Sequence, residues 1–120
     1  NILAYKAKSE RAEATQDESE KQKRLLEEKI KLETVNALLD LNRAQENTEV
    51  ANQEVDLAKL ALKISEEKYR QGVGNILELT TAQLSLIKAQ TDYLDSIYNY
   101  KIAIATIEHV SGTKIEEIQY

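Results

Sequence analysis

Small and apolar residues recur along most of this chain at alternating steps of three and four positions. In the first half the series is Thr34, Ala37, Leu41, Ala44, Thr48, Ala51, Val55, Ala58, Leu62, Ser65 and Tyr69. In the second half it is Leu79, Ala82, Leu86, Ala89, Tyr93, Ser96, Tyr100, Ala103, Ile107 and Val110. This is the spacing of a left-handed coiled-coil seam, so the sequence predicts two long helices that pack against each other. In both series small residues alternate with larger ones, which lets the helices approach closely.

One short break, residues 71–75, separates the two series and holds two of the three glycines. Gly72 can take the left-handed conformation that ends many helices. Asn75 is a favourable N-cap, and Glu78 follows it at the spacing of a capping box. Because these stop and start signals lie so close together, we predict an all-α helical hairpin with a tight tip. The expected segments are a long helix over about residues 2–70, a tip turn over 71–75, a shorter helix over about 76–110 and a C-terminal tail over 111–120.

Each predicted helix carries a second set of apolar residues outside the seam. On the first helix the set is Val50, Leu57, Leu60 and Ile64. On the second helix it is Leu77, Leu84, Tyr98 and Ala105, with Leu94, Ile97 and Ile104 nearby. A two-stranded coil needs only one apolar stripe, so two stripes indicate neighbours on both sides of each helix. Periodicity alone leaves two architectures open, a barrel of helices arranged like staves and a helical bundle with a wide buried face.

The N-terminal part of the long helix is polar on every side, and residues 16–24 contain no apolar residue. A helix of this kind usually bridges solvent or is supported by a partner, so we expect its packing partners to lie outside this chain. The chain begins without Met in sequence that is already helical. We therefore expect it to be an excised fragment or a mature segment.

The composition supports helices and argues against several kinds of function. The chain lacks Pro, Cys, Met, Trp and Phe, and 31% of its residues are charged. A net charge of −5 and the lack of a basic stripe argue against nucleic-acid binding. No apolar stretch reaches the roughly 20 residues of a membrane-spanning helix. With no nucleophile–base pair, phosphate loop or metal-ligand cluster, the sequence predicts no enzyme activity, no cofactor and no metal site. His109, the only histidine, lies in the last turn of the second helix, where a cation complements the helix dipole.

The tip and the second helix carry an extended motif. From the tip it reads Tyr69-Arg70-Gln71-Gly72, then Leu77-Glu78-Leu79 as an apolar–acidic–apolar step, then Ala82-Gln83. Its further positions are Ala89, Tyr93, Tyr100, Ala103, Ile107 and Gly112. This pattern, which runs from about Ala58 to Gly112, resembles the repeat of TolC-type outer-membrane efflux and secretion channels.

The resemblance implies an architecture and a set of partners. In such proteins three protomers build an outer-membrane β-barrel that continues as a periplasmic tube of helices, and each protomer carries two strand–helix repeats. The chain would then be the helical part of the C-terminal repeat, located in the periplasm and belonging to a homotrimer in a trimeric α-barrel. Its partners would be a periplasmic adaptor (membrane fusion) protein and, through it, an inner-membrane pump or ABC transporter. The expected roles are multidrug efflux or type I secretion.

The resemblance also assigns roles to tip residues. The family meets its adaptor through the tip loop, so the expected docking residues are Gly72, Val73, Gly74 and Asn75. The expected constriction and gating residues are Tyr69, Arg70, Glu78 and Thr81. Some members carry acidic rings at the positions of Glu78 and Thr81, and only Glu78 is acidic here.

Two of these gating assignments have alternatives. Tyr69 matches a tyrosine that helps to hold the tip closed, but it can equally be a seam residue near the turn. The closing arginine of some members is replaced by Gly74, so that lock is either missing or supplied by Arg70.

A polar stripe follows the second helix at the same three- and four-residue steps. Its members are Glu78, Thr81, Ser85, Lys88, Asp92, Asp95 and Asn99. The stripe is either a solvated face of no special role or the face of the tube that touches water, inside or outside.

Two other functions compete with a channel segment. A periplasmic adaptor also contains a helical hairpin, but its arms are of similar length and it lacks the Tyr-x-x-Gly turn. A stand-alone structural coiled coil would need nothing beyond the heptad pattern.

Overall fold

The computed structural model describes residues 1–112 and contains two α-helices joined by a short turn. Helix α1 spans Ile2–Arg70 and helix α2 spans Ile76–Ser111. Gly112 caps the C-terminal end of α2, and its φ of 65° lies in the left-handed region. The predicted all-α hairpin is confirmed. Residues 113–120, which make up most of the expected tail, lie outside the described residues.

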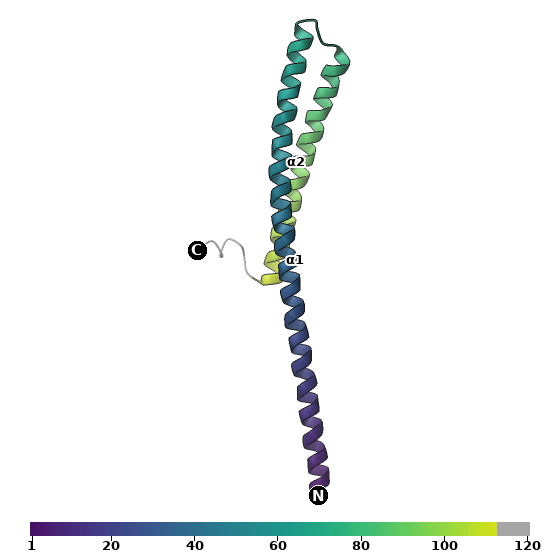
Figure 1. Cartoon of the computed structure of the whole chain (residues 1–120), viewed down its shortest axis with the longest axis vertical. Helices are drawn as coiled ribbons and strands as arrows, with labels where there is room; N and C mark the ends of the chain where they lie inside the picture. The colour runs from purple at the N-terminus through teal and green to yellow at the C-terminus, as the bar shows by residue number, and fades with distance from the viewer. Residues whose placement is uncertain (113–120) are drawn as a thin grey trace, which may run out of the picture. The chain divides into compact units, whose positions relative to one another are not determined.

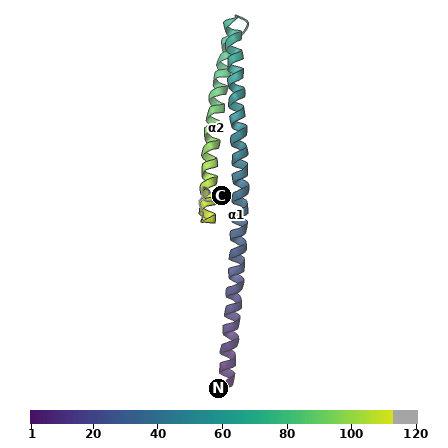
Figure 2. The ribbon, with the colours of Figure 1, turned by 90° about the vertical axis from the view of Figure 1, so that its left-hand side faces the viewer.

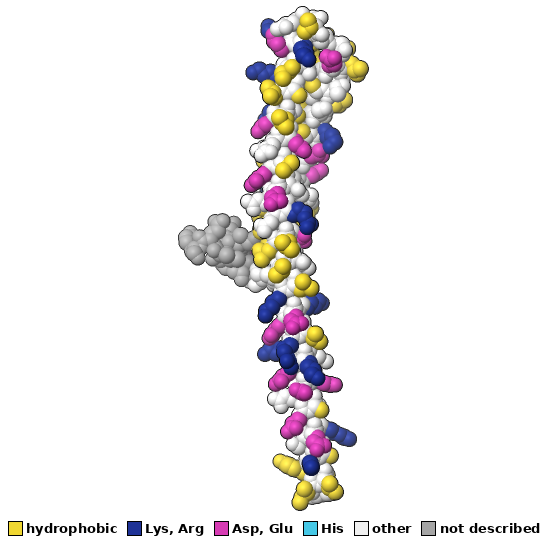
Figure 3. Space-filling model, viewed as in Figure 1, with side chains coloured by type: hydrophobic (Ala, Val, Ile, Leu, Met, Phe, Trp, Pro, Cys, Tyr) yellow, Lys and Arg dark blue, Asp and Glu magenta, His cyan; other side chains and the backbone are white. Residues whose placement is uncertain are grey.

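The chain divides into two units, Asn1–Asn36 and Ala37–Tyr120. The first unit is the N-terminal part of α1, and every side chain from position 1 to 33 is exposed. Acidic and basic side chains are mixed on its surface (Figure 3). Such a helix gains little from burial, so local propensity and side-chain pairs must support it. One such pair is Lys29 with Glu33, whose Nζ and Oε1 atoms are 3.9 Å apart.

In the second unit, α2 runs beside the part of α1 that begins at Ala37 (Figure 1 and Figure 2). The buried residues of the described chain all belong to the predicted seams: Ala37, Ala51, Val55, Ala89 and Ile107. The other seam residues of this unit are half-buried, with one exception. Tyr69, at the tip end of the seam, is 47% exposed, and both interpretations of its role stay predictions.

A polar layer near the middle of the seam aligns the two helices. The Thr48 hydroxyl on α1 shares its proton between the Ala44 carbonyl of its own helix at 3.0 Å and the Ser96 carbonyl on α2 at 3.3 Å. The Ser96 hydroxyl donates to the Tyr93 carbonyl at 2.7 Å. A polar residue in an otherwise apolar seam is a well-attested way to specify register.

On this register the helices are antiparallel, and each step along α1 is matched by an equal step back along α2. In the resulting pairs, a small residue of one helix lies opposite a larger residue of the other. The pairs are Ala37 with Ile107, Leu41 with Ala103, Ala44 with Tyr100, Ala51 with Tyr93, Val55 with Ala89, Ala58 with Leu86, Leu62 with Ala82 and Ser65 with Leu79. In two of these pairs, Ala37–Ile107 and Val55–Ala89, both members are buried. Because every large side chain faces a small one, the helices can interlock at close approach.

The second set of apolar residues remains largely uncovered (Figure 3). Its α1 members, Val50, Leu57, Leu60 and Ile64, are 49–66% exposed. Ile97 and Ile104 of α2 are half-buried, whereas Leu77, Leu84, Leu94, Tyr98 and Ala105 are exposed. The hairpin therefore covers one apolar stripe of each helix and leaves another uncovered. Within residues 1–112, neither helix is long and apolar enough to cross a membrane.

We expect Ala51→Leu to destabilise the hairpin by about 1–3 kcal/mol, because the larger side chain must displace Tyr93 across the seam. Urea unfolding followed by circular dichroism measures the effect. Ala61→Leu is the matched control, since Ala61 is exposed on the same helix and its substitution should change stability by no more than about 0.5 kcal/mol. Equal effects at the two positions would contradict the interlocking seam.

Candidate functional site

The tip is a hydrogen-bonded turn that ends α1. The Gly72 N–H donates to the Tyr69 carbonyl, and the Val73 N–H donates to the Lys68 carbonyl, both at 3.0 Å. With Gly72 in the left-handed region at a φ of 79°, these two bonds form a Schellman motif, which satisfies carbonyls at the helix end. The Gly74 N–H adds a further bond to the Lys68 carbonyl, also at 3.0 Å. The turn is therefore closely tied to the last turn of α1.

The two tip glycines are needed for different physical reasons. A Cβ atom at Gly74 would lie 3.0 Å from the Lys68 Cβ and 3.2 Å from the backbone of Lys68 and Tyr69. Glycine thus lets the turn fold back against α1. A Cβ at Gly72 would meet nothing, but the left-handed backbone there disfavours other residues.

Val73 is presented to solvent by this turn, with 74% of its surface exposed. In a Schellman motif the residue at this position often contacts an apolar residue at the third or fourth place before the helix end. Here those places hold Lys68 and Glu67. The two places that usually supply this apolar contact therefore hold charged residues instead.

Glu67 organises the side chains at the end of α1. The Arg70 guanidinium donates to both Glu67 carboxylate oxygens, with Nη2 at 2.7 and 2.8 Å and Nε at 3.1 Å. The Gln71 amide donates to the same carboxylate at 2.7 Å. These bonds, Arg70 first and then Gln71, lower the pKa of Glu67. We call these three side chains the Glu67 clasp.

The start of α2 is fixed by Asn75, whose side-chain Oδ1 accepts the Glu78 N–H at 2.8 Å. Its extended backbone, with φ of −114° and ψ of 164°, suits an N-cap. Glu78 lies in the first turn, where a carboxylate complements the helix dipole. Thr81 lies one turn further on, and both side chains are exposed.

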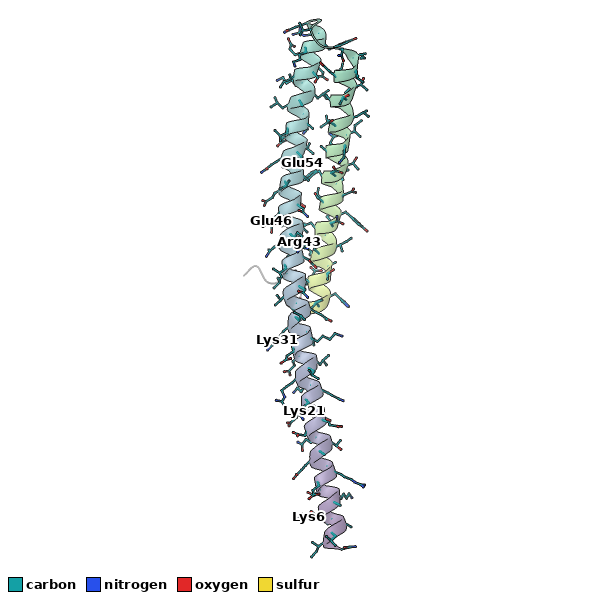
Figure 4. All side chains as sticks on the ribbon, turned by 45° about the vertical axis from the view of Figure 1, so that its right-hand side comes forward. Lys6, Lys21, Lys31, Arg43, Glu46 and Glu54 are labelled. Carbon is teal, nitrogen blue, oxygen red and sulfur yellow. The ribbon has the colours of Figure 1, made fainter. Side chains whose placement is uncertain are left out.

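The predicted polar stripe of α2 shares one side of the hairpin with polar residues of α1. Lys88 donates to Asp92 at 2.6 Å, and this bond, with the Asp92 charge and a smaller effect of Glu54 on α1, raises the pKa of Lys88. Glu54 is labelled in Figure 4. Farther from the tip, a groove of about 410 Å³ lies between the helices on this side. Its polar lining comes from Asp40, Arg43 and Asn47 of α1 and from Asp92, Asp95, Ser96, Asn99 and Thr106 of α2. We call this side the polar flank.

The structure brings some of the sequence-predicted residues together and separates others. Gly72, Val73 and Gly74 form one turn, which Asn75 follows as the N-cap. Arg70 is held by Glu67 of its own helix, so here it is paired within the chain. His109 is exposed in the last turn of α2.

Sequence reasoning missed Glu67 and the α1 half of the polar flank. A signal for Glu67 exists: an acid in the last turn of a helix opposes the dipole, and a base three residues later offsets it. The α1 half of the flank could have been found from its heptad positions beside the seam.

A comparison with protein families decides what kind of protein this is. The sequence model of the outer membrane efflux protein family matches residues 4–113, which include the tip, α2 and nearly all of α1. The chain belongs to the outer membrane efflux protein family. Neither a curated protein nor a solved structure gives a significant match.

Membership of the outer membrane efflux protein family confirms the resemblance carried by the tip motif. The family is one of outer-membrane transport channels rather than enzymes, so the hairpin is a segment of an outer-membrane efflux channel. Adaptor hairpins and stand-alone coiled coils do not account for this match.

The lowered pKa of Glu67 gives the clasp a definite pH dependence. Because the folded tip favours the carboxylate, the contribution of the clasp is present above the ordinary pKa range of glutamate. It is lost as the pH falls through the lowered pKa. We expect an NMR titration of the Glu67 carboxyl to give a midpoint below the ordinary glutamate value, and Arg70→Ala to raise that midpoint. A midpoint unchanged by Arg70→Ala would contradict the clasp.

Proposed function

We propose that residues 1–120 form part of the wall of the periplasmic tube in a trimeric outer-membrane channel, with the hairpin tip at the periplasmic entrance. The tube would be an α-barrel in which the full-length protomers surround one axis. Family membership supports the channel. The uncovered apolar stripes of both helices support a place between neighbouring helices.

The tip turn is the proposed docking site for a periplasmic adaptor protein, and exposed Val73 is the observation that carries this assignment. An apolar side chain with 74% exposure contributes little to folding, yet two glycines and three backbone hydrogen bonds hold its turn in shape. A preorganised turn loses little freedom on binding. Gly72, Gly74 and Asn75 therefore shape the docking surface, while Val73 makes the apolar contact.

The proposed constriction lies just beside this turn. Glu78 is exposed at the start of α2, and three copies around a narrow axis would attract cations and repel one another. Thr81 adds hydroxyls without charge. Tyr69, half exposed near the same end, would contact a neighbouring helix. Arg70 is held in the Glu67 clasp. It would close the entrance by bonding to a neighbouring helix only after its bonds to Glu67 break.

The partners follow from this assignment. The adaptor would link the channel to an inner-membrane pump or an ABC transporter, in tripartite multidrug efflux or in type I secretion. No nucleic acid is expected, because the chain is acidic with a net charge of −5.

Val73→Glu in the full-length protein tests the docking assignment. We expect the variant to fold and reach the outer membrane, but to lose cross-linking to the adaptor and export, because a charge replaces the apolar contact and both glycines stay in place. Val73→Leu is the matched control and should keep both activities.

A second control separates docking from the constriction. Glu78→Gln should change the single-channel conductance while leaving adaptor cross-linking intact. If Val73→Glu cross-links and exports like the parent protein, the tip turn is not the docking site.

A further inference from the structure

The carboxylate of Glu67 joins the end of α1 to the tip turn. Its Oε1 atom accepts one bond from the Arg70 guanidinium and another from the Gln71 amide, both at 2.7 Å. The Gln71 backbone N–H also donates to the Glu67 carbonyl at 3.0 Å. Gln71 is therefore tied to Glu67 twice, through its main chain and through its side chain. Within residues 1–112, no other side chain of the turn bonds to α1.

These bonds determine how two long side chains at the edge of the turn are placed. Arg70 and Gln71 each bond to a residue three or four places earlier in α1, so their polar ends lie along the helix and away from the turn. Gln71 also directly precedes Gly72, whose left-handed backbone turns the chain. Without Glu67, both side chains would be free to move over the exposed surface of Val73. The clasp therefore controls what surrounds the apolar residue of the turn.

The stability of α1 does not explain a carboxylate at position 67. The C-terminal end of a helix carries a partial negative charge, which an acidic side chain opposes, and alanine forms helix more readily at any such position. The other ion pairs of residues 1–112, such as Asp40 with Arg43 at 3.4 Å, each join two side chains within one helix. Glu67 differs from these acids because it also binds a residue beyond the end of its helix.

We propose that Glu67 is a positioning residue for the docking turn: it holds Arg70 and Gln71 back along α1 and so keeps Val73 uncovered on a turn of fixed shape. The inference rests on the proposed docking function, and Glu67 acts through the turn without touching the adaptor. A turn that is already ordered loses less freedom on binding. Because 76% of the Arg70 side chain and 46% of the Glu67 side chain are exposed, the effect is of the size that surface ion pairs produce.

Amide hydrogen exchange in the 120-residue chain tests the ordering of the turn without any adaptor. In Glu67→Ala we expect the Val73 and Gly74 amides, which both donate to the Lys68 carbonyl, to exchange about two- to fivefold faster. Helix propensity and the helix dipole alone predict the opposite, because alanine favours the helix. Asp40→Ala is the matched control. It removes the acid of an exposed pair at the same three-residue spacing and should leave both amides unchanged.

Cross-linking of the full-length protein to its adaptor, with the adaptor below saturation, tests the consequence for docking. We expect Glu67→Ala to lower the yield by about two- to fivefold, and Asp40→Ala to keep the yield of the parent protein. Gln71→Ala should also lower the yield. The double variant Glu67→Ala with Gln71→Ala should lose no more than the larger of the two single losses, because Glu67 acts through the side chains that it holds.

Two results would overturn the role of Glu67. One is exchange of the Val73 and Gly74 amides in Glu67→Ala at the parent rate. The other is a pair of cross-linking losses that add in the double variant, since Glu67 would then contact the adaptor itself. Failure of the docking assignment looks different: Val73→Glu then cross-links like the parent protein, whatever the exchange rates of the two amides. If Val73→Glu loses cross-linking while Glu67→Ala behaves like the parent protein, only the role of Glu67 is wrong.

Discussion

The pairing of small with large residues across the seam is the interaction on which the rest of this structure depends. A helix that buries nothing must rely on local propensity and side-chain pairs, whereas most helical stability in proteins comes from tertiary packing. From Ala37 onward, α1 gains the packing of α2, and the five buried residues within positions 1–112 all lie in this contact. The alanines matter as much as the larger residues, because close approach leaves no room for two large side chains at one level. The polar Thr48–Ser96 layer then selects one alignment.

The alignment of the helices has consequences at both outer faces and at the tip. It leaves an apolar stripe of each helix uncovered by the other helix. It also leaves only four backbone links between Gln71 and Asn75 to reverse the chain. Gly72 turns the backbone and Gly74 lets it pass Lys68. Val73, the apolar residue between them, stays 74% exposed. An exposed valine on a constrained turn is thus a product of the same seam that stabilises the helices.

Much of the fold could be predicted from the sequence, because the periodicity of apolar residues indicates which side chains are buried. Ala51 and Ala89 are buried and Leu57 is exposed, as the three- and four-residue steps predict. The tip turn was predictable from Gly72 and Asn75, because the local backbone preferences of these two residues decide where one helix ends and the next begins. The partial exposure of Tyr69 was not, because the seam pattern continues through it although α1 ends one residue later, at Arg70. The Glu67 clasp depends on side-chain geometry that spacing alone does not determine. The roles of Glu78 and Thr81 depend on neighbours outside this chain, which no property of one hairpin can establish.

Hydrogen exchange of the chain, under conditions where sedimentation shows a monomer, tests the central role of the seam most directly. Amides protected by tertiary packing exchange far more slowly than amides of a solvated helix. If the seam stabilises the hairpin, residues 44–65 of α1 exchange much more slowly than residues 8–30 of the same helix. Equal protection of the two segments in a strict monomer would show that α1 is stable without α2, and it would contradict this account.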